Sequence, residues 1–517
     1  MGPGAPVKRR TVLGALALAG CSKPPAVEGG WVGAAHERGH RLRSGTLPVA
    51  AVQRRAAVLI VGAGVAGLAA ARGFAKAGVD DVQLLELEDR PGGNSRGHVL
   101  AGQPCPLGAH YLPVPGAAAH EVSEWLFEIG LLRHELGRTV ADERHLCHSP
   151  QERLFIDGAW AEGLLPPAEP GSLTLAQYRR FAERVAAAQQ LGFAIPTTRA
   201  PWTAAHAALD ASTFADWLAR EGFDDARLRW YLDYCCRDDY GAGAATVSAW
   251  AGLHYFASRH GFHAPGDDAA EREPVFTWPE GNAWLATRLA APFADRLHTG
   301  RTVLRVTEGR HGVQVLAWDE AASRAEAWTA ERVVLALPLF VAARVLENPP
   351  DALRAAAASQ PHAPWLVANL HLDRALLDRP GAPPSWDNVA HGAAGLGYVD
   401  AGHQRLNPAP GVTVLTAYQA LPETQRGALL SDDWATWTGR IVDDLATLHP
   451  DLRAKLRRAD LMRYGHAMAI PAPGQRGSTA LAALRAQRGR VRFAHADLAG
   501  YSVFEEAFTL GLAAAQG

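Results

Sequence analysis

The stretch that decides the fold is AAVLIVGAGVAG, residues 56–67, followed by the helix-forming residues 68–76. Six apolar residues have the length of a buried strand, and the glycines predict a tight turn from this strand into a helix. Gly62 permits the turn, Gly64 lets backbone N–H groups approach an anion, and Gly67 lets the helix pack closely on the strand. The pattern therefore predicts an anion site at a positive helix end.

A second apolar strand, residues 82–85, ends at Glu86, which stands 24 positions beyond Gly62. An acidic side chain at this place accepts hydrogen bonds from a ribose diol and disfavours a 2′-phosphate. The two strands and the glycine turn together predict a Rossmann-like unit that binds a dinucleotide.

The next residues distinguish FAD from NAD. The run DRPGGNS, residues 89–95, places a second glycine pair, Gly92 and Gly93, directly after the acid that would bind ribose. Dehydrogenases that bind only NAD do not need such a pair. FAD is therefore the expected cofactor.

At this point the chain resembles the flavin-containing amine oxidase superfamily, which includes monoamine and polyamine oxidases, L-amino-acid oxidases, protoporphyrinogen oxidase and phytoene desaturases. The family pattern Leu-Glu-Ala followed by Asp-Arg-x-Gly-Gly-Arg is similar to LEL at 85–87 and DRPGGN at 89–94. Asn94 stands where the family usually has Arg, so a positive charge near the pyrophosphate is missing. The resemblance implies FAD contacts from this end of the chain at Gly62, Gly64, Ala66, Gly67, Glu86, Arg90, Gly92, Gly93 and Asn94.

Further matches follow in the order that this family requires. GAHY at 108–111 resembles the segment that passes the flavin ring, and TWPEGNAWL at 277–285 resembles a turn that leads into a helix. The strand at 301–306, the strand RVVLALP at 332–338 and the closing segments 495–497 and 504–511 are also similar to family motifs. A helix that begins near Phe504 would point its positive end at the flavin. The resemblance implies further FAD contacts at Ala109, Val303, Asp497, Glu505, Glu506 and Ala507.

The expected fold is α/β, with a Rossmann-like FAD-binding domain assembled from discontinuous segments and an α+β substrate domain with a mixed sheet and helices. The predicted FAD-binding segments are residues 56–115, 275–345 and 466–517, and the substrate domain takes residues 116–274 and 346–465. Within the latter, the sequence predicts a hairpin at 153–160, helices at 173–191 and 213–221, and a strand at 364–372.

The candidates for catalysis are His110, Tyr464 and His466, because the resemblance places them beside the flavin. Amine oxidases of this family commonly carry a lysine on the strand that corresponds to residues 364–372, and this chain has none there. Its absence disfavours direct oxidation by oxygen and favours an electron carrier as acceptor.

Residues 230–263 are rich in Tyr, Cys, Asp and His, including the pair Asp238 and Asp239. They form either a substrate pocket or a structural helix-turn-helix. Cys235 and Cys236 are either buried inert thiols or a strained redox disulfide.

The N-terminus predicts export. Lys8-Arg9-Arg10 precedes a short apolar run and the sequence LAGC, which ends at Cys21. This pattern is typical of a twin-arginine signal peptide with a lipoprotein cleavage site, residues 1–21. Residues 22–55 are expected to form a linker, and the enzyme would lie in the periplasm or on the membrane through a lipid on Cys21.

The composition limits the classes of partner that the protein is expected to bind. Lys+Arg 51 against Asp+Glu 53 gives no basic surface for nucleic acid, and five irregularly spaced cysteines predict neither a metal site nor a disulfide framework. The expected function is hydride transfer from a small, amine-like molecule to FAD N5, with oxygen or another acceptor reoxidising the cofactor. The alternatives are a desaturase or isomerase of a polyene-like substrate and a flavin-binding lipoprotein without turnover.

Overall fold

The computed structural model describes residues 26–43, 45, 47–266, 274–405 and 412–516. The predicted signal peptide, with Arg9, Arg10 and Cys21, lies outside the described residues. Among those residues, no helix is long and apolar enough to cross a membrane.

The first sheet is built around the glycine-rich segment. Its strands follow the order β12-β3-β2-β15-β14-β13, with β21 paired to β15. β2 lies parallel to β3 and β15, and Val58 pairs with Val82 on one side and with Arg332 on the other. The strands are β2 (Ala50–Val61), β3 (Val82–Leu85), β12 (Leu297–His298), β13 (Arg301–Gly309), β14 (Gly312–Asp319), β15 (Arg324–Leu335) and β21 (Val491–Phe493).

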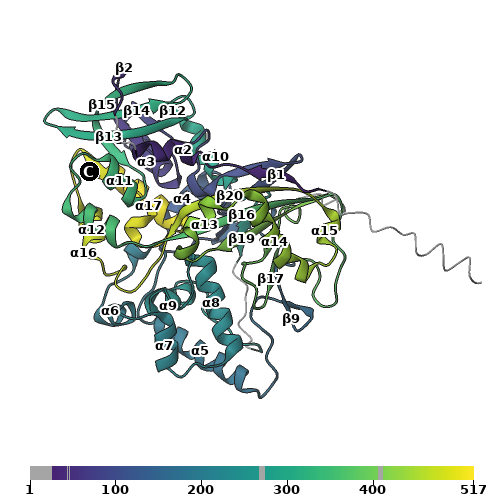
Figure 1. Cartoon of the computed structure of the whole chain (residues 1–517). Helices are drawn as coiled ribbons and strands as arrows, with labels where there is room; N and C mark the ends of the chain where they lie inside the picture. Colours follow the sequence, from purple (N-terminus) through teal and green to yellow (C-terminus); the bar gives the residue numbers. More distant parts are fainter. Residues whose placement is uncertain (1–25, 44, 46, 267–273, 406–411, 517) are drawn as a thin grey trace, which may run out of the picture.

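Three pieces of chain that lie far apart in the sequence therefore meet in one sheet, as predicted. Each piece supplies an apolar strand that is buried in this sheet. Figure 1 shows this sheet above the rest of the molecule, with α3 (Val65–Lys76), α10 (Ala283–Ala290) and α17 (Phe504–Ala515) beneath it. Gly511 of α17 lies so close to α3 that an added Cβ would come 2.2 Å from the Ala66 carbonyl oxygen. The first and last helices of the cofactor domain thus contact each other backbone to backbone.

The second sheet belongs to the substrate domain and has the order β1-β20-β16-β19-β18-β17-β9-β10. It is mixed, because β16 pairs antiparallel with β19 and β20 whereas β17 pairs parallel with β9. The strands are β1 (Glu28–Trp31), β9 (Glu152–Ile156), β10 (Ala159–Glu162), β16 (His362–Leu372), β17 (Asp387–Ala390), β18 (Tyr398–Asp400), β19 (Thr413–Ala420) and β20 (Leu456–Ala469).

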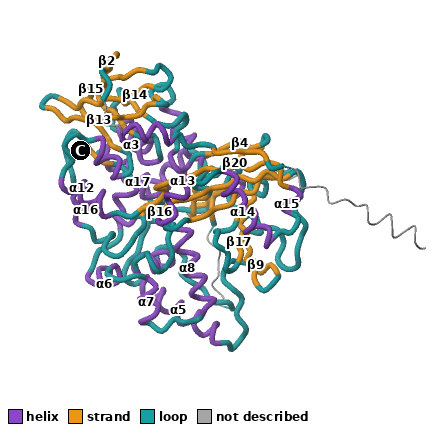
Figure 2. The backbone as a smooth tube through the Cα atoms, viewed as in Figure 1, coloured by secondary structure: helices purple, strands orange, loops and turns teal. Residues whose placement is uncertain are grey.

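Helices gather on one side of this sheet, in the lower part of Figure 2. They are α5 (Leu173–Gln189), α6 (Ala204–Asp210), α7 (Phe214–Arg220), α8 (Ala226–Tyr240) and α9 (Ala249–Ala257). A side-chain cap begins each of the five, because its capping oxygen accepts a backbone N–H of the first turn. The capping residues are Ser172, Thr203, Thr213, Asp225 and Ser248. The fold class predicted from the sequence is confirmed, with its Rossmann-like unit and its mixed-sheet and helical substrate domain.

The local predictions in the substrate domain hold. β9 and β10 form the hairpin, and Asp157 and Gly158 turn it with φ of 52° and 85°. Helices α8 and α9 lie within the stretch 230–263 and fit the helix-turn-helix alternative, although Asp238, Asp239 and Arg259 of this stretch also line the cavity described below. Cys235 and Cys236 are free and buried, and burial raises the pKa of both thiols, so the inert-thiol interpretation fits the structure.

The structure differs from the expected linker at residues 22–55. β1 adds an edge strand to the substrate sheet, with Gly29 opposite Ala459, and α2 (His36–His40) and η1 (Arg41–Arg43) follow it. β2 also begins at Ala50, earlier than predicted. The sequence did not reveal β1 because the strand that it pairs with, β20, lies more than 400 positions away along the chain.

Candidate active site

One cavity of about 750 Å³ runs from the glycine turn of the first sheet into the substrate domain. Its volume lies in the range typical of ligand sites. Most residues predicted to contact FAD line it, namely Gly62, Gly64, Ala66, Glu86, Gly92, Gly93, Asn94, Ala109, Val303, Asp497, Glu505 and Ala507. The candidates His110, Tyr464 and His466 line it as well. The structure therefore brings motifs from the N-terminal and C-terminal parts of the described chain to one cavity.

The glycine turn has the geometry of a pyrophosphate site. Gly62 has a φ of 97°, and an added Cβ there would come 2.4 Å from the Ala336 carbonyl oxygen. α3 begins after Gly64 without a side-chain cap and without an acidic residue in its first turn. Its first N–H groups are thus available to an anion at the positive helix end. The residues present fit the phosphates of FAD.

Glu86 closes this end of the cavity. It is buried, and its carboxylate accepts hydrogen bonds from the N–H of Ala63 at 2.7 Å and of Glu88 at 2.9 Å. Burial raises the pKa of the Glu86 carboxyl, against the effect of these two bonds. Glu86 therefore fixes the glycine loop while it faces the place expected for the ribose.

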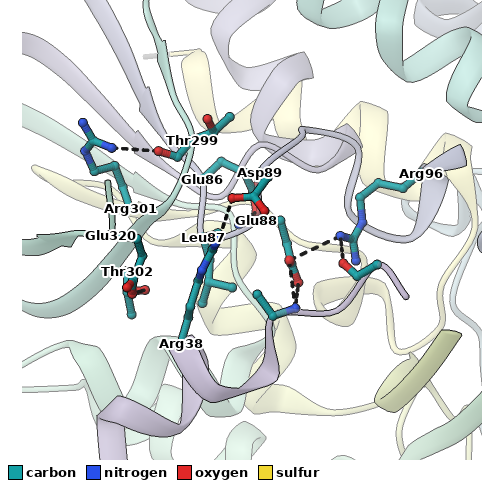
Figure 3. Close-up of polar contacts among 12 residues, drawn as sticks. Arg38, Glu86, Leu87, Glu88, Asp89, Arg96, Thr299, Arg301, Thr302 and Glu320 are labelled. Carbon is teal, nitrogen blue, oxygen red and sulfur yellow. Dashed lines mark hydrogen bonds and ion pairs between the residues drawn. The ribbon is translucent and has the colours of Figure 1, made fainter. Parts of the chain in front are cut away.

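The N-terminal segment also reaches this end, which the sequence did not predict. Figure 3 shows Arg38 donating to the Leu87 carbonyl and pairing with Asp89, both at 2.8 Å. The Glu88 carboxylate accepts the N–H of Ala35 at 3.0 Å, and Arg96 pairs with Glu88 at 3.4 Å. Through these contacts residues 39, 40, 42 and 43 come to line the cavity.

Asp497 lies at the centre of a polar cluster. It is fully buried, and one oxygen accepts the N–H of Leu339 at 2.9 Å and Nε2 of His362 at 3.1 Å. Its other oxygen lies 3.1 Å from Nδ1 of His495. Burial alone would raise the pKa of Asp497, but the charge of His495 and the bond from His362 outweigh it and hold that pKa far below its usual value. Asp497 is therefore a fixed negative charge that orders the loop before α11 (Leu339–Val345).

An aromatic wall surrounds the predicted flavin-side residues. The ring of His110 stacks on Tyr418 with centroids 4.4 Å apart and lies 5.4 Å from Trp386. The Tyr418 hydroxyl donates to Gly108 O at 3.0 Å, and that of Tyr464 donates to Leu107 O at 2.8 Å. Tyr418 and Trp365 also line the cavity, and the sequence had not singled them out.

Burial changes the protonation of His110. An ordinary imidazole titrates near neutrality, but burial lowers the pKa of His110 to about 3, against a smaller opposing effect of its bond to Gly108. The ring is therefore neutral at physiological pH and does not gain or lose a proton there. Its contacts suit a neutral ring that positions the loop at Gly108.

Three predicted contact residues do not line the cavity. Gly67 lies behind it, where an added Cβ would come 1.9 Å from the Gly62 carbonyl oxygen, so this glycine serves helix packing as predicted. Arg90 is exposed. Glu506 turns away to accept the N–H of Thr197, whereas its neighbour Glu505 faces the cavity. Sequence proximity to a motif did not reveal these side-chain directions.

The helical domain contributes the remaining wall. Asp238, Asp239 and Arg259 line the cavity, and all three lie in or near the stretch 230–263 that is rich in reactive residues. His254 of the same stretch is fully buried and lies 3.2 Å from the Ala194 carbonyl, which fits a structural role.

The comparisons with known proteins identify the family of this chain. The model of a family described as flavin-containing amine oxidoreductase matches residues 65–517. The chain belongs to this family. Membership confirms the resemblance noted in the sequence, with FAD as cofactor, and places the chain among FAD-dependent oxidoreductases.

A curated relative from Mycobacterium tuberculosis, named "Putative flavin-containing monoamine oxidase AofH", is 28% identical over 265 residues, which cover 50% of this chain and 52% of the relative. The chain thus matches about half the length of its curated relatives. Putrescine oxidase bound to putrescine superposes with a TM-score of 0.64 at 19% identity over 89% of this chain and 98% of that one. Cyclohexylamine oxidase from Brevibacterium oxydans gives 0.65 at 18% over the same shares. These likenesses show the fold.

Proposed function

We propose that the protein oxidises a small amine by hydride transfer from the carbon that bears the nitrogen to FAD N5. The observation that carries the proposal is the single cavity that joins the glycine turn to the aromatic and acidic walls of the substrate domain. FAD, when bound, supplies the two-electron acceptor. An acidic wall attracts a cationic amine and is poorly suited to an uncharged, apolar polyene, so it favours amine oxidation over the polyene desaturase or isomerase alternative.

The chain's own residues would position the substrate. His110, Tyr418, Trp365 and Tyr464 line the cavity with aromatic rings. Such rings would exclude water and attract a cation through their π faces. His110 stays neutral and holds the loop at Gly108. Asp238 and Asp239 of the helical domain line the same cavity and would attract positive charge.

The proposed type of electron acceptor is inferred from the lack of a lysine on β16. β16 carries none, while Lys455 is bound to the Ala375 carbonyl and Asp451, and Lys76 to Glu124 and Glu128. Without an ammonium beside the flavin, we expect reoxidation by a quinone-like carrier to exceed reoxidation by oxygen.

Anaerobic mixing of the holoenzyme with n-butylamine tests the proposed reaction. We expect loss of the oxidised flavin absorbance and formation of the aldehyde, followed by faster reoxidation with an artificial quinone than with dissolved oxygen. A panel of alcohols and unsaturated fatty acids serves as the comparison. Bleaching by one of those classes and not by amines would contradict the proposal, and an inert flavin would favour a binding protein without turnover.

We also propose that the enzyme is exported as a folded lipoprotein, on the strength of Arg9, Arg10 and the LAGC sequence that ends at Cys21. Changing Arg9 and Arg10 together to Lys should retain FAD-loaded protein in the cytoplasm, because the twin-arginine pair addresses the signal peptide. Fractionation with immunoblotting measures this, and Cys21→Ala, which should alter acylation alone, is the control. Unchanged export of the double variant would contradict the twin-arginine route.

A further inference from the structure

The N-terminal segment, residues 33–43, forms a part of the cavity wall that the family match does not account for. The match begins at residue 65. Within the segment, Gly39, His40, Leu42 and Arg43 line the cavity together with the residues that fit FAD. The segment therefore borders the cofactor site from outside the matched part of the chain.

Contacts with several parts of the fold hold this segment in place. Arg38 binds the residues that follow β3, as described above. Arg41 pairs with Glu320, which follows β14, at 2.9 Å. The Leu42 carbonyl accepts a hydrogen bond from Nε of Arg344, on α11, at 3.0 Å. The backbone is thus fixed as far as the last residues of η1.

The segment first meets the cavity at the ribose end. An added Cβ at Gly39 would come 3.9 Å from Cδ1 of Leu87, and Leu87 directly follows Glu86. Because Glu86 faces the place expected for the ribose, Gly39 lies beside the adenosine half of the cofactor site. The residues after Gly39 continue along the cavity wall.

Arg43 lies further along this wall, on the side of the second glycine pair. Burial is the main cause of the lowered pKa of His466, and the charge of Arg43 contributes to it, so these two side chains are close. His466 precedes Ala467, whose carbonyl accepts Nδ2 of Asn94 at 2.6 Å. Asn94 directly follows the second glycine pair, and all four residues line the cavity. Arg43 therefore borders the cavity near the place expected for the phosphates.

Four arginines line the cavity, namely Arg43, Arg259, Arg301 and Arg344. Arg259 pairs with Asp239 at 3.1 Å. Arg301 pairs with Asp319 at 2.8 Å. Within the described part of the chain, the Arg43 side chain forms no hydrogen bond or ion pair, so its charge is available to a ligand. The phosphates of FAD need such a charge, because the glycine turn offers them N–H groups but no cationic side chain.

We propose that the Arg43 guanidinium binds the pyrophosphate of FAD and that residues 33–43 clasp the cofactor. Arginine suits this role because its planar donors match phosphate oxygens and form strong charge-assisted hydrogen bonds. Arg38 is not among the residues that line the cavity, and it acts as a positioning residue that holds the segment at the ribose end. No bond is made or broken, so the clasp changes the affinity and release of FAD, whichever substrate the holoenzyme oxidises.

Titration of the apoprotein with FAD tests the Arg43 contact. Arg43→Gln should weaken FAD binding by about 10-fold, the scale of a hydrogen bond to a charged group. Adenosine carries no phosphate, so its affinity should not change. Arg43→Lys keeps the charge but loses the planar donors, and it should recover part of the affinity for FAD. Arg310→Gln removes an exposed arginine at the turn between β13 and β14 and is the matched control.

Salt concentration gives a second readout. Arg43 is exposed, so dissolved ions screen its attraction to the phosphates. Added sodium chloride should therefore weaken FAD binding more in the wild type than in Arg43→Gln. Equal salt dependence of the two proteins, or equal affinity for FAD, would overturn the contact. A parallel loss of adenosine affinity would overturn it as well, because Arg43 would then shape the adenosine site.

The rate of FAD release tests the positioning role of Arg38. Arg38→Ala removes the contacts with Leu87 and Asp89, so FAD should dissociate faster from this variant than from the wild type. In the Arg43→Gln background the same change should add little, because both changes act through one contact. Fully additive effects would overturn the clasp. Thermal unfolding of the apoproteins is measured alongside, and an Arg43→Gln chain that fails to fold would contradict the proposal, because Arg43 would then support the fold itself.

Discussion

Replacing Gly67 by Ala should weaken FAD binding by more than about 100-fold. The added Cβ would stand 1.9 Å from the Gly62 carbonyl oxygen and 3.2 Å from Cβ of Ala336. Both neighbours belong to the strand and turn that shape the pyrophosphate site, so α3 must move away from β2. Overpacking of a rigid contact costs about 3 kcal/mol or more, and each 1.4 kcal/mol is a tenfold change in affinity. Bound FAD per protein, measured by absorbance after purification and by titration of the apoprotein, checks the prediction.

Gly116→Ala is the matched control for Gly67→Ala. It makes the same change of residue, but nothing lies within 4 Å of the added Cβ. We expect normal FAD content for this variant. Circular dichroism of both proteins separates a displaced helix from a chain that has failed to fold. A Gly67→Ala protein with full FAD occupancy would show that the helix and the turn do not need to approach so closely.

Changing Asp497 to Asn should lower the free energy of unfolding by about 3 kcal/mol at pH 7. Breaking a buried charged network leaves the groups that faced the carboxylate without their partner. Here those groups are the N–H of Leu339 and the ring of His362, and an amide can satisfy only part of them. Urea unfolding, followed by tryptophan fluorescence and repeated with excess FAD, measures the loss.

The pH dependence of this difference has a definite sign. The pKa of Asp497 is depressed in the folded state, so its stabilisation is complete above the ordinary value of 3.8 and is lost as the pH falls below it. The gap between wild type and Asp497→Asn should therefore stay constant from pH 8 to 5 and narrow in more acidic solution. Asp295→Asn, a change at an exposed residue, should have little effect throughout. Equal stability of Asp497→Asn and wild type at pH 7 would refute the buried-anion account.

Most residues that the sequence predicted to contact FAD line one cavity, because they belong to local patterns. The glycine turn, Glu86 and the second glycine pair are set by short-range requirements of backbone conformation, close approach and strand length, so their spacing carries the information. The start of α17 and the strand with Val303 followed from family motifs. These segments meet because each carries an apolar strand or helix that is stable only in the shared core.

Side-chain direction was the first limit of prediction from sequence. Adjacent Glu505 and Glu506 look equivalent in the sequence, yet one faces the cavity and the other binds Thr197. The protonation state of His110 was the second property that the sequence could not predict. Only the packed structure shows that Tyr418 and Trp386 contact the ring and that burial lowers its pKa.

By itself, the sequence determined a Rossmann-like unit, because glycine turns and apolar strands are local features. Its resemblance to a known family implied that later segments of the chain complete the FAD-binding domain. Only the tertiary structure decided that the N-terminal segment contacts the residues next to Glu86 through Arg38 and that Asp238 of the helical domain lines the same cavity. The physical reason is that burial, charge pairing and cavity shape depend on contacts between residues hundreds of positions apart. Local sequence patterns do not predict those contacts.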